Sequence, residues 1–311
     1  MAEIIITEFI DQSAVDNLAA DFDTVYDPTL VDQPDRLLGM VGAAPALIVR
    51  NRTQVRGALL EAAAGLKVVG RLGVGLDNID MDACAARDIT VCPATGANNV
   101  SVAEYVVTTM LTLLRGPAYD VTQAVLAGDW PRTDAIGREG SGKTLGLIGY
   151  GAIGRDVARR AAPLGLNIVA HDPLLPANDP AWNDVSSMKL GELVASSDVI
   201  SLHVPLTDQT RHLIDADAIA RMKPGTVVIN AARGGVVDES ALAAALKDGG
   251  LGGAALDVFE TEPVTAESGA HLADVPNLIL TPHIAGLTDE ANLRTSDLTA
   301  ANVRRVLEAC S

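Results

Sequence analysis

Three side chains whose types suit chemistry on a small organic acid follow short aliphatic runs late in the chain: Arg233, Glu262 and His283. The planar, permanently charged fork of an arginine suits a carboxylate beside a carbonyl. A histidine can move the proton on a carbonyl or hydroxyl oxygen near neutral pH. A carboxylate beside the imidazole favours the protonated ring and fixes its orientation. The set predicts interconversion of a 2-hydroxy acid and a 2-oxo acid, with Arg233 orienting the substrate, His283 as acid/base and Glu262 as its partner.

These residues can converge if the aliphatic runs are strands of one open α/β sheet, because ligands bind such sheets beyond the carboxyl ends of the strands. Each residue alone also has a structural interpretation. A histidine after a strand is more often a satisfied structural residue, Arg233 could solvate a turn, and Glu262 could cap the following segment. Their joint occurrence behind a nucleotide-type loop favours the catalytic interpretation.

That loop is L-G-L-I-G-Y-G-A-I-G-R-D, in which Gly149, Gly151 and Gly154 match G-x-G-x-x-G. The three glycines permit a tight turn, close approach of a pyrophosphate, and close helix–strand packing, with the diphosphate on the helix N-terminus. The next run ends at Asp172, about 20 residues further on. A carboxylate there accepts ribose hydroxyls and repels a 2′-phosphate, so NAD is predicted rather than NADP. The alternatives are a methyltransferase loop and an Asp172 that merely caps a turn before Pro173.

Short aliphatic runs alternate with helical patterns along nearly the whole chain. The first series of runs is 4–7, 46–50, 66–70 and 89–92, with a helix expected at 54–64. A second series of predicted strands begins at Thr144, and a last helix is expected at about 288–308. Continuous apolar strands separated by helices predict parallel sheets covered on both faces.

The segment between the two series differs. S-V-A-E at Ser101 matches a capping box, and the helix predicted after it is apolar on nearly every face. Such a helix needs burial all round, at a domain junction or a subunit interface. A polar, glycine-rich stretch then leads to Lys143. We therefore expect one domain at 1–98 and another at 99–286.

Composition excludes several classes of protein. The formal net charge of −17 would repel nucleic acids and anionic membranes. Cysteines are odd in number and lack C-x-x-C spacing, which favours reduced thiols in a cytoplasmic compartment. The first residues lack the basic region of a signal peptide, and no apolar run approaches the length of a membrane span. We expect a cytoplasmic protein with no metal site.

Five motifs together resemble the D-isomer-specific 2-hydroxyacid dehydrogenases. They are K-T-L-G-L-I-G-Y-G-A-I-G-R, S-L-H-V-P-L-T, M-K-P-G-T-V-V-I-N-A-A-R-G-G-V-V-D, A-L-D-V-F-E-T-E-P and L-T-P-H-I-A-G. The resemblance covers about 71–286 and implies an α/β fold: a Rossmann doubly wound parallel sheet inserted in a smaller flavodoxin-like α/β substrate domain. It implies that 1–98 plus 287–311 form the substrate domain, that 99–286 binds NAD, and that the nucleotide-binding lobe builds a homodimer.

The resemblance also implies roles for individual residues. Arg233 orients the substrate, Glu262 partners His283, and His283 is the acid/base. The residues expected against NAD are Gly149, Gly151, Ala152, Ile153, Gly154, Asp172, Pro205, Ala231 and Asp257. Asp257 would hold the nicotinamide carboxamide. In G-R-L-G-V-G-L-D-N-I-D, the amides of Val74 and Gly75 would face the acid group of the substrate.

The remaining question is which hydroxy acid is bound. Arg50 and Arg52 follow a predicted strand, and Thr53 could cap the next helix, which makes an anion site. This segment resembles the phosphate-binding segment of 3-phosphoglycerate dehydrogenases, although a solvated pair of arginines fits equally well. The later H-I-A-G-L-T-D-E-A-N looks more like sulfolactate dehydrogenases, and no regulatory domain for serine feedback is expected after it. We expect a substrate with a second anion, sulfonate or phosphate; the alternative is a non-catalytic NAD(H)-sensing protein of the same fold.

Overall fold

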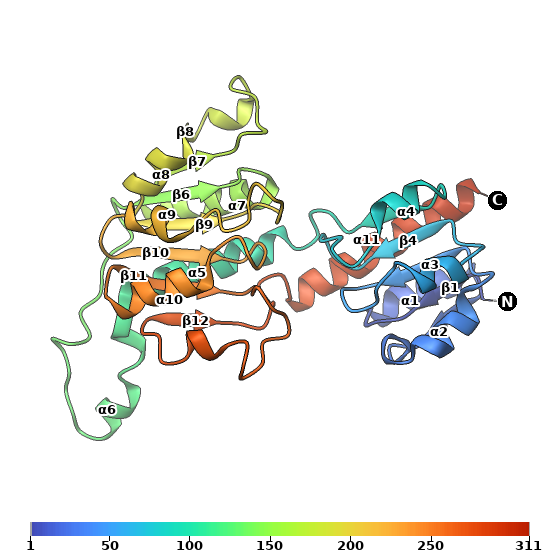
Figure 1. The fold of residues 1–311 in the computed structure, drawn as a ribbon, viewed down its shortest axis with the longest axis horizontal. Coiled ribbons are helices and arrows are strands. Elements are labelled where there is room, and N and C mark those ends of the chain that lie inside the picture. Colours follow the sequence, from blue (N-terminus) through green and yellow to red (C-terminus); the bar gives the residue numbers. More distant parts are fainter. Residues whose placement is uncertain (1, 311) are drawn as a thin grey trace. The chain divides into compact units, whose positions relative to one another are not determined.

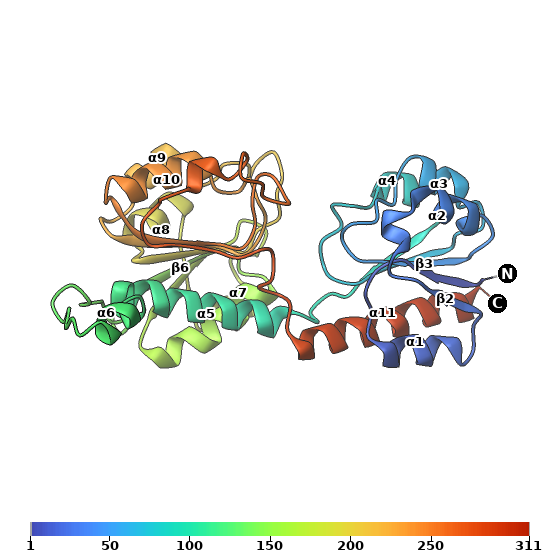
Figure 2. The same ribbon diagram turned by 90° about the horizontal axis from the view of Figure 1, so that it is seen from below.

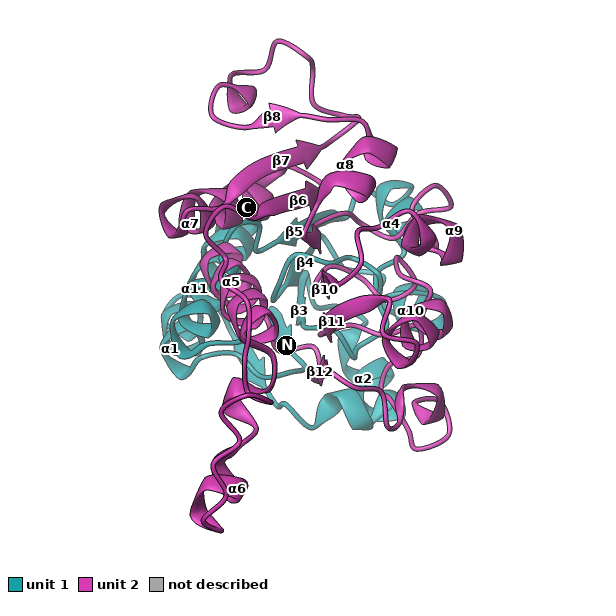
Figure 3. Ribbon diagram, turned by 90° about the vertical axis from the view of Figure 1, so that its left-hand side faces the viewer, with its two compact units in different colours: residues 1–98, 287–311 teal, residues 99–286 magenta. Residues whose placement is uncertain are grey.

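Continuous aliphatic runs form the strands of two separate parallel sheets, each with helices on both faces. The computed structural model describes residues 2–310 (Figure 1). The chain divides into unit 1, residues 1–98 with 287–311, and unit 2, residues 99–286 (Figure 3). The second unit is thus inserted between two segments of the first.

The strands of unit 1 lie in the order β2-β1-β3-β4-β5, and every pairing is parallel. They are β1 (Ile4–Ile6), β2 (Thr24–Tyr26), β3 (Ala46–Val49), β4 (Val68–Arg71) and β5 (Thr90–Pro93). This is the order of a flavodoxin-like sheet. The edge strand β2 was not predicted, because its side chains are only partly buried and form no continuous apolar run.

The helices of unit 1 are α1 (Gln12–Ala19), α2 (Pro34–Val41), α3 (Ala58–Ala62), α4 (Met81–Ala85) and α11 (Asp289–Ala309). Figure 2 shows α1 and α11 on one face of the sheet and α2, α3 and α4 on the other. The helix predicted at 54–64 is wrong in extent: Val55 forms a β-bridge with Ile79, and Gly57 has φ +50°, so α3 begins later. Gly57 rather than Thr53 precedes that helix, so the predicted Thr53 cap is also wrong.

The strands of unit 2 lie in the order β12-β11-β10-β9-β6-β7-β8, again all parallel. They are β6 (Thr144–Ile148), β7 (Asn167–His171), β8 (Ser186–Ser187), β9 (Val199–Leu202), β10 (Thr226–Asn230), β11 (Leu251–Leu256) and β12 (Leu278–Leu280). The sheet is doubly wound, with its switch point between β6 and β9. The predicted α/β fold class is confirmed; only the short Ser-Ser edge strand β8 gave no hydrophobic signal.

In unit 2, α5 (Asn99–Arg115) and α7 (Ala152–Ala161) cover one face of the sheet, and α8 (Leu190–Ser196), α9 (Ala216–Ala220) and α10 (Glu239–Lys247) cover the other (Figure 2). The predicted capping box is wrong, because α5 begins at Asn99 and Ser101 lies buried in its first turn. Helix α5 buries one face, including Val106 and Met110, against the sheet and α7. Glu104 lies on the exposed side, so the unit itself buries only part of this helix.

An excursion between α5 and β6 carries the short helix α6 (Thr122–Leu126) away from the body of unit 2 (Figures 1 and 3). We call residues 116–139 the arm. Large apolar side chains on the arm are exposed, above all Leu126 at 75% and Trp130 at 74%. Exposed apolar groups gathered in one segment are typical of an interaction surface.

The structure bears on two sequence expectations, one about membrane-spanning segments and one about the cysteines. Among residues 2–310, no helix is both long and apolar enough to cross a membrane. All three cysteines fall within this described range and are free thiols. Burial raises the pKa of Cys84 and of Cys92, which keeps both as unreactive thiols.

Candidate active site

His283 and Glu262 form an ion pair at the carboxyl edge of the unit 2 sheet. His283 follows β12 and Glu262 follows the neighbouring strand β11, and Nδ1 of the histidine lies 2.8 Å from Oε2 of the carboxylate. An ionised carboxylate can only accept, so Nδ1 is the donor and Nε2 is the nitrogen left to meet a substrate. The side chains are 47% and 35% exposed, so small molecules can reach the ring.

Glu262 is held in its charged form. Burial alone would raise its pKa, but the hydrogen bond with His283, the amide of Phe259 at 3.0 Å from Oε1, and the charges of His283 and Arg233 together lower the pKa below its usual value. The carboxylate is therefore ionised at neutral pH and is available as the acceptor for the ring nitrogen of His283.

The turn that presents His283 has an unusual backbone. His283 has φ +56°, in the left-handed region that costs a residue with a side chain about 1 kcal/mol. Its amide donates to the carbonyl of Thr281 at 3.0 Å, which forms a γ-turn around the intervening proline. Asp257 then accepts the amides of Ile284 and Ala285 at 2.8 Å each. A carboxylate that is 1% exposed thus holds the turn in place.

A third donor, the hydroxyl of Thr281, reaches the same carboxylate. The hydroxyl of Thr281 donates to Oδ1 of Asp257 at 2.6 Å, and the Tyr105 hydroxyl from α5 lies 2.7 Å from Thr281 Oγ1. Burial raises the pKa of Tyr105, so its hydroxyl keeps its proton. Because a carboxylate has about four acceptor positions, Asp257 retains room for one more donor such as a carboxamide.

Arg233 lies in a loop that contacts the segment leading to Glu262. The side chain of Asn230, at the end of β10, folds this loop by donating to the carbonyl of Arg233 at 2.9 Å and accepting the amide of Ala232 at 3.1 Å. A Cβ on Gly234 would lie 1.7 Å from the carbonyl oxygen of Phe259. The structure therefore brings Arg233, Glu262 and His283 to adjacent strand ends in one unit.

The glycine-rich loop has the geometry expected of a diphosphate site. Gly149 has φ +92°, and a Cβ there would lie 2.4 Å from the carbonyl oxygen of His203. A Cβ on Gly154 would lie 2.5 Å from the carbonyl of Gly149, so this glycine lets α7 approach the strand. At Gly151 a Cβ would meet no atom within 4 Å, and no side chain caps α7 there. The open glycine and uncapped helix leave space and free amides for a pyrophosphate, the first of which belong to Ala152 and Ile153.

Asp172 follows β7 and lies against this loop. Its Oδ2 accepts the amide of Tyr150 at 2.9 Å, and its Oδ1 accepts the amide of Leu174 at 3.0 Å. It therefore caps a turn, as the structural interpretation held, and also contacts the glycine-rich loop. With two acceptor positions remaining, the carboxylate can still take ribose hydroxyls.

The other residues expected against the cofactor also lie at the carboxyl edge of the sheet. Pro205 follows β9, which borders the switch point, and Ala231 follows β10 directly. The described residues thus fit a dinucleotide: a diphosphate loop, an acid for the ribose, and an edge that ends at His283.

In unit 1, the predicted anion segment is largely occupied by side chains of the chain itself. Glu8, which is buried, accepts the amides of Arg50, Arg52 and Thr53 at 2.9, 3.1 and 3.0 Å. Arg52 is paired with Asp32 at the surface. The backbone amides that could have received a phosphate or sulfonate therefore already hold a carboxylate.

Arg50 has weaker partners. Its guanidinium donates to the neutral amide oxygen of Asn292 at 2.8 Å and lies 5.7 Å from the ring centre of Phe9. Burial lowers the pKa of Arg50, against the opposing charge of Glu8, although an arginine stays charged at any physiological pH. Of the two arginines, Arg50 is the better placed to accept an anion.

Val74 and Gly75 lie in the loop after β4, beside the strand that leads to Arg50. The side chain of Asn78 joins the two segments, because its Nδ2 donates to the carbonyls of Thr53 at 2.8 Å and Arg50 at 3.3 Å. Val74 is exposed, so this loop is open to a ligand.

Sequence reasoning did not single out the residues that hold these segments. They are Glu8, Asn78, Tyr105 and Thr281. For Glu8 the available signal was a charged side chain in a largely apolar stretch next to a strand end, I-I-I-T-E-F-I. Such a side chain is buried only when hydrogen-bonded.

Comparison with known proteins assigns the chain to a family. A family model described as "D-isomer specific 2-hydroxyacid dehydrogenase, NAD binding domain" matches residues 107–285. The chain is 56% identical over 308 residues, 99% of each chain, to an (S)-sulfolactate dehydrogenase of Chromohalobacter salexigens. It is 42% identical over 279 residues to a D-3-phosphoglycerate dehydrogenase of Mycobacterium leprae, which covers 89% of this chain and 52% of that protein.

A solved structure gives the same result. The D-lactate dehydrogenase of Aquifex aeolicus, in complex with NAD and lactic acid, matches with a TM-score of 0.85 and 29% identity, over 98% of this chain and 95% of that one. These relatives are dehydrogenases, and they give no support to the alternative of a non-catalytic NAD(H)-sensing protein.

Proposed function

We propose, on the premise that this chain belongs to the D-isomer-specific 2-hydroxyacid dehydrogenase family, that it interconverts sulfolactate and sulfopyruvate with NAD(H). That it is an NAD-dependent oxidoreductase of a small 2-hydroxy acid follows from the family. The substrate and the role of each residue are the proposal. One observation carries it: the exposed His283–Glu262 pair at 2.8 Å, on the same sheet edge as the glycine-rich loop.

The chemistry follows from the groups at that edge. Bound NADH supplies a hydride to the carbonyl carbon of the 2-oxo acid. His283, protonated and paired with Glu262, donates the proton from Nε2 to the carbonyl oxygen, and in the reverse direction accepts it. Arg233 directs its guanidinium at the 2-oxo group of the substrate and so orients the carbonyl toward His283.

The cofactor is held by the groups already described. We assign the pyrophosphate to the loop from Gly149 to Gly154 and the ribose hydroxyls to Asp172. Pro205 and Ala231 line the path toward the nicotinamide, and Asp257 takes the carboxamide at its remaining acceptor position.

The substrate assignment rests on a second anion. We assign the substrate carboxylate to the amides of Val74 and Gly75 and the sulfonate to Arg50, with Arg52 less favoured because Asp32 already neutralises it. The 56% identical relative named as an (S)-sulfolactate dehydrogenase supports a sulfonate over a phosphate.

A substrate panel tests this proposal. NADH oxidation is measured with sulfopyruvate, 3-phosphohydroxypyruvate, hydroxypyruvate, pyruvate and glyoxylate. We expect the highest kcat/KM with sulfopyruvate. Arg50→Gln should lower that kcat/KM by about 10- to 100-fold, the value of one charge-assisted contact, while pyruvate is affected less than threefold.

Arg52→Gln is the matched control, since it removes an equal charge from the same segment. A loss with Arg50→Gln that is equal on pyruvate and sulfopyruvate would contradict the sulfonate site. A wild-type preference for pyruvate or glyoxylate over every dianionic acid would contradict the substrate itself.

We further propose a cytoplasmic homodimer. The free thiols fit a reducing compartment. The exposed apolar side chains of the arm, with Leu126 and Trp130 foremost, and the part of α5 that unit 2 leaves open fit the same surface of a second copy.

A further inference from the structure

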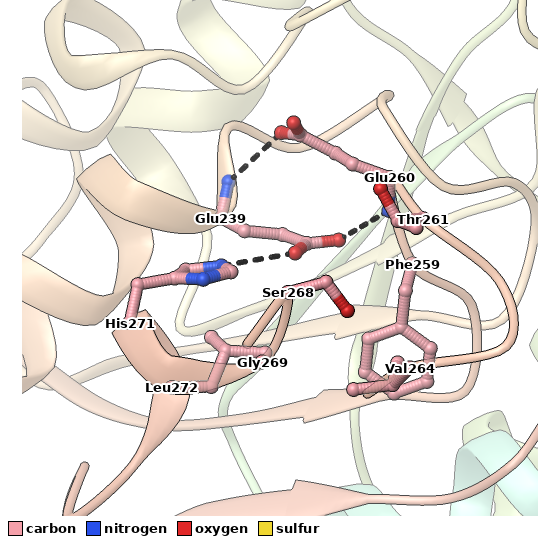
Figure 4. A pocket seen from close by; sticks show the side chains of 9 residues that line it. All are labelled: Glu239, Phe259, Glu260, Thr261, Val264, Ser268, Gly269, His271 and Leu272. Atoms are coloured by element: carbon pink, nitrogen blue, oxygen red, sulfur yellow. Dashed lines mark hydrogen bonds and ion pairs between the residues drawn. The ribbon is translucent and has the colours of Figure 1, made fainter. Parts of the chain in front are cut away.

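A second polar cluster lies behind the segment that carries Glu262. Glu239, the first residue of α10, is 5% exposed and lines a small pocket together with Phe259, Glu260 and His271 (Figure 4). Burying a carboxylate costs free energy unless its oxygens find partners. The partners of Glu239 therefore indicate what it does.

Those partners form a reciprocal exchange with the segment after β11. Oε1 of Glu239 accepts the amide of Glu260 at 2.6 Å, and Oε2 lies 3.1 Å from Nε2 of His271 (Figure 4). In return, Oε1 of Glu260 lies 3.5 Å from the amide of Glu239 and 3.1 Å from Nε2 of His212. These contacts tie the N-terminus of α10 to the backbone at Glu260.

The backbone held in this way leads directly to the reactive pair. Phe259, the neighbour of Glu260, donates its amide to Oε1 of Glu262 at 3.0 Å, while Oε2 of Glu262 faces His283 at 2.8 Å. Gly234, beside Arg233, packs against the carbonyl of Phe259. A shift at Glu260 would therefore move the amide that orients the Glu262 carboxylate.

We propose that Glu239 is a positioning residue for proton transfer: by accepting the amide of Glu260, it keeps residues 259–262 in the conformation that aims Glu262 at His283. His271 is the partner of the second carboxylate oxygen. This role rests on the proposed function and adds to it a residue that touches neither substrate nor cofactor.

Titration of Glu239 itself should not break its hydrogen bond with the Glu260 amide. Burial raises the pKa of Glu239, while the Glu260 amide and His271 oppose that rise. The titratable groups that face it are Glu260 from the segment after β11 and His271 from the turn after that segment; His212 pairs with Glu260 further out. A carboxyl group keeps an acceptor oxygen in either protonation state, so the Glu260 bond persists through the pH range of an assay.

The experiment compares the pH dependence of kcat for 2-oxo acid reduction in wild type and three variants. Glu239→Met keeps the side-chain volume but has no acceptor, whereas Glu239→Gln keeps an acceptor for the Glu260 amide. Asp238→Ala removes the neighbouring side chain that caps α10 by accepting the amide of Ala241. Under the proposed function His283 must be protonated for reduction, so kcat should fall as the pH rises; this fall is the alkaline limb of the pH profile. Loosening Glu262 should move that limb to lower pH.

For Glu239→Met we expect kcat to fall about 10-fold and the alkaline limb to move down by about half a pH unit, part of the 1–3 units that a full opposite charge supplies. KM and the NADH dissociation constant should stay within about twofold. Glu239→Gln should restore the wild-type limb, and Asp238→Ala should not move it. An unmoved limb in Glu239→Met, no rescue by Glu239→Gln, or an equal shift in Asp238→Ala would each overturn the positioning role.

A measurement on the wild-type protein covers the case in which Glu239→Met fails to fold. The Glu260 amide should exchange its hydrogen slowly, and faster in Glu239→Met when that variant is folded. Rapid exchange at Glu260 in the wild type would overturn the proposal without any variant. Absence of wild-type turnover on every 2-oxo acid would instead refute the proposed function. The hydrogen-exchange measurement would still test whether Glu239 holds the Glu260 amide.

Discussion

At the scale of single residues, this protein uses carboxylates for distinct tasks that their partners define. Glu262 takes one backbone amide and an imidazole and stays charged, whereas Asp172 takes the amides of Tyr150 and Leu174. Both tasks leave acceptor capacity unused. Under the proposed function, the negative charge of Asp172 beside the glycine-rich loop would favour NAD over NADP, because a 2′-phosphate would meet it directly.

Replacement of Asp172 tests that selection. Asp172→Ala should weaken NADH binding about 10-fold and narrow the NADH/NADPH preference by at least about 10-fold, since both hydrogen bonds and charge are lost. Fluorescence titration of each cofactor gives the two dissociation constants. Asp172→Asn is the control: it keeps an acceptor for the Tyr150 amide, so it should narrow the preference with a smaller loss of NADH affinity. An unchanged preference in both variants would refute the ribose site.

The sequence was enough to predict which functional residues lie at the strand ends, but not which groups they contact. Arg233, Glu262 and His283 could be placed together because the carboxyl ends of parallel strands meet at one edge. The occupation of the Arg50 and Arg52 amides by Glu8 could not be predicted, because a distant strand end brings that carboxylate in. Pairings of this kind depend on tertiary structure rather than on spacing along the chain.

At the scale of elements, the strand ends are shaped by buried polar groups behind them. The turn after β12 keeps His283 in a left-handed conformation, and Asp257 from the end of β11 supplies the acceptors that make this possible. Sequence pattern located the strands but not this turn. The starts of α5 at Asn99 and of α3 at Ala58 likewise differ from those that the sequence pattern predicted.

Removing the charge of Asp257 should loosen the turn. Asp257→Asn places an amide nitrogen against the Ile284 or Ala285 amide, so we expect a loss of about 2 kcal/mol in the free energy of unfolding and a fall in kcat of about 10-fold. Urea unfolding and steady-state kinetics measure the two effects. Thr281→Val, which removes one donor from the same carboxylate, should cost about 1 kcal/mol. A stable, fully active Asp257→Asn would show that the turn needs no such support.

The end of β9 carries a second test at this scale. His203 is partly buried against the glycine-rich loop, with Nε2 3.0 Å from the hydroxyl of Ser201, and loss of solvent around the ring lowers its pKa from 6.5 to about 4. Between these two pKa values, His203 is therefore protonated in the unfolded chain and neutral in the folded chain. As pH falls below about 6.5, this residue makes unfolding progressively more favourable.

We expect the stability difference between wild type and His203→Gln to shrink by about 2 kcal/mol between pH 7.5 and pH 5, because glutamine cannot titrate. Urea unfolding at both pH values gives the difference. A wild-type protein whose stability relative to His203→Gln does not change with pH would show that the pKa of His203 is not lowered in the folded chain.

At the scale of the whole molecule, each of the two sheets follows a known strand order. The short aliphatic runs predicted parallel sheets, whereas the flavodoxin-like organisation of unit 1 was implied only by the family resemblance. The short edge strands β2 and β8 escaped prediction, because edges are only partly buried and need no apolar run. The arm was seen in the sequence only as a polar, glycine-rich stretch. Its exposed Leu126 and Trp130 became evident as a surface only once the structure showed that unit 2 does not cover them.

A charged residue introduced into the arm should dissociate the proposed dimer. Trp130→Glu should convert the wild-type dimer to a monomer or weaken it at least about 100-fold, because a buried carboxylate without a partner is costly at an interface. Sedimentation velocity over a range of concentrations measures this. Leu174→Glu is the matched control, since Leu174 is 89% exposed but lies outside the arm. A monomeric wild type, or a Trp130→Glu dimer of unchanged affinity, would refute the interface.

The most direct test is the turnover of His283→Ala with sulfopyruvate and NADH, measured beside its NADH dissociation constant. We predict a loss in kcat of about 1,000-fold, within the range for removal of a general acid, and NADH affinity within about twofold of wild type. Turnover within tenfold of the wild-type rate, with NADH bound normally, would contradict the assignment of His283 as the proton donor.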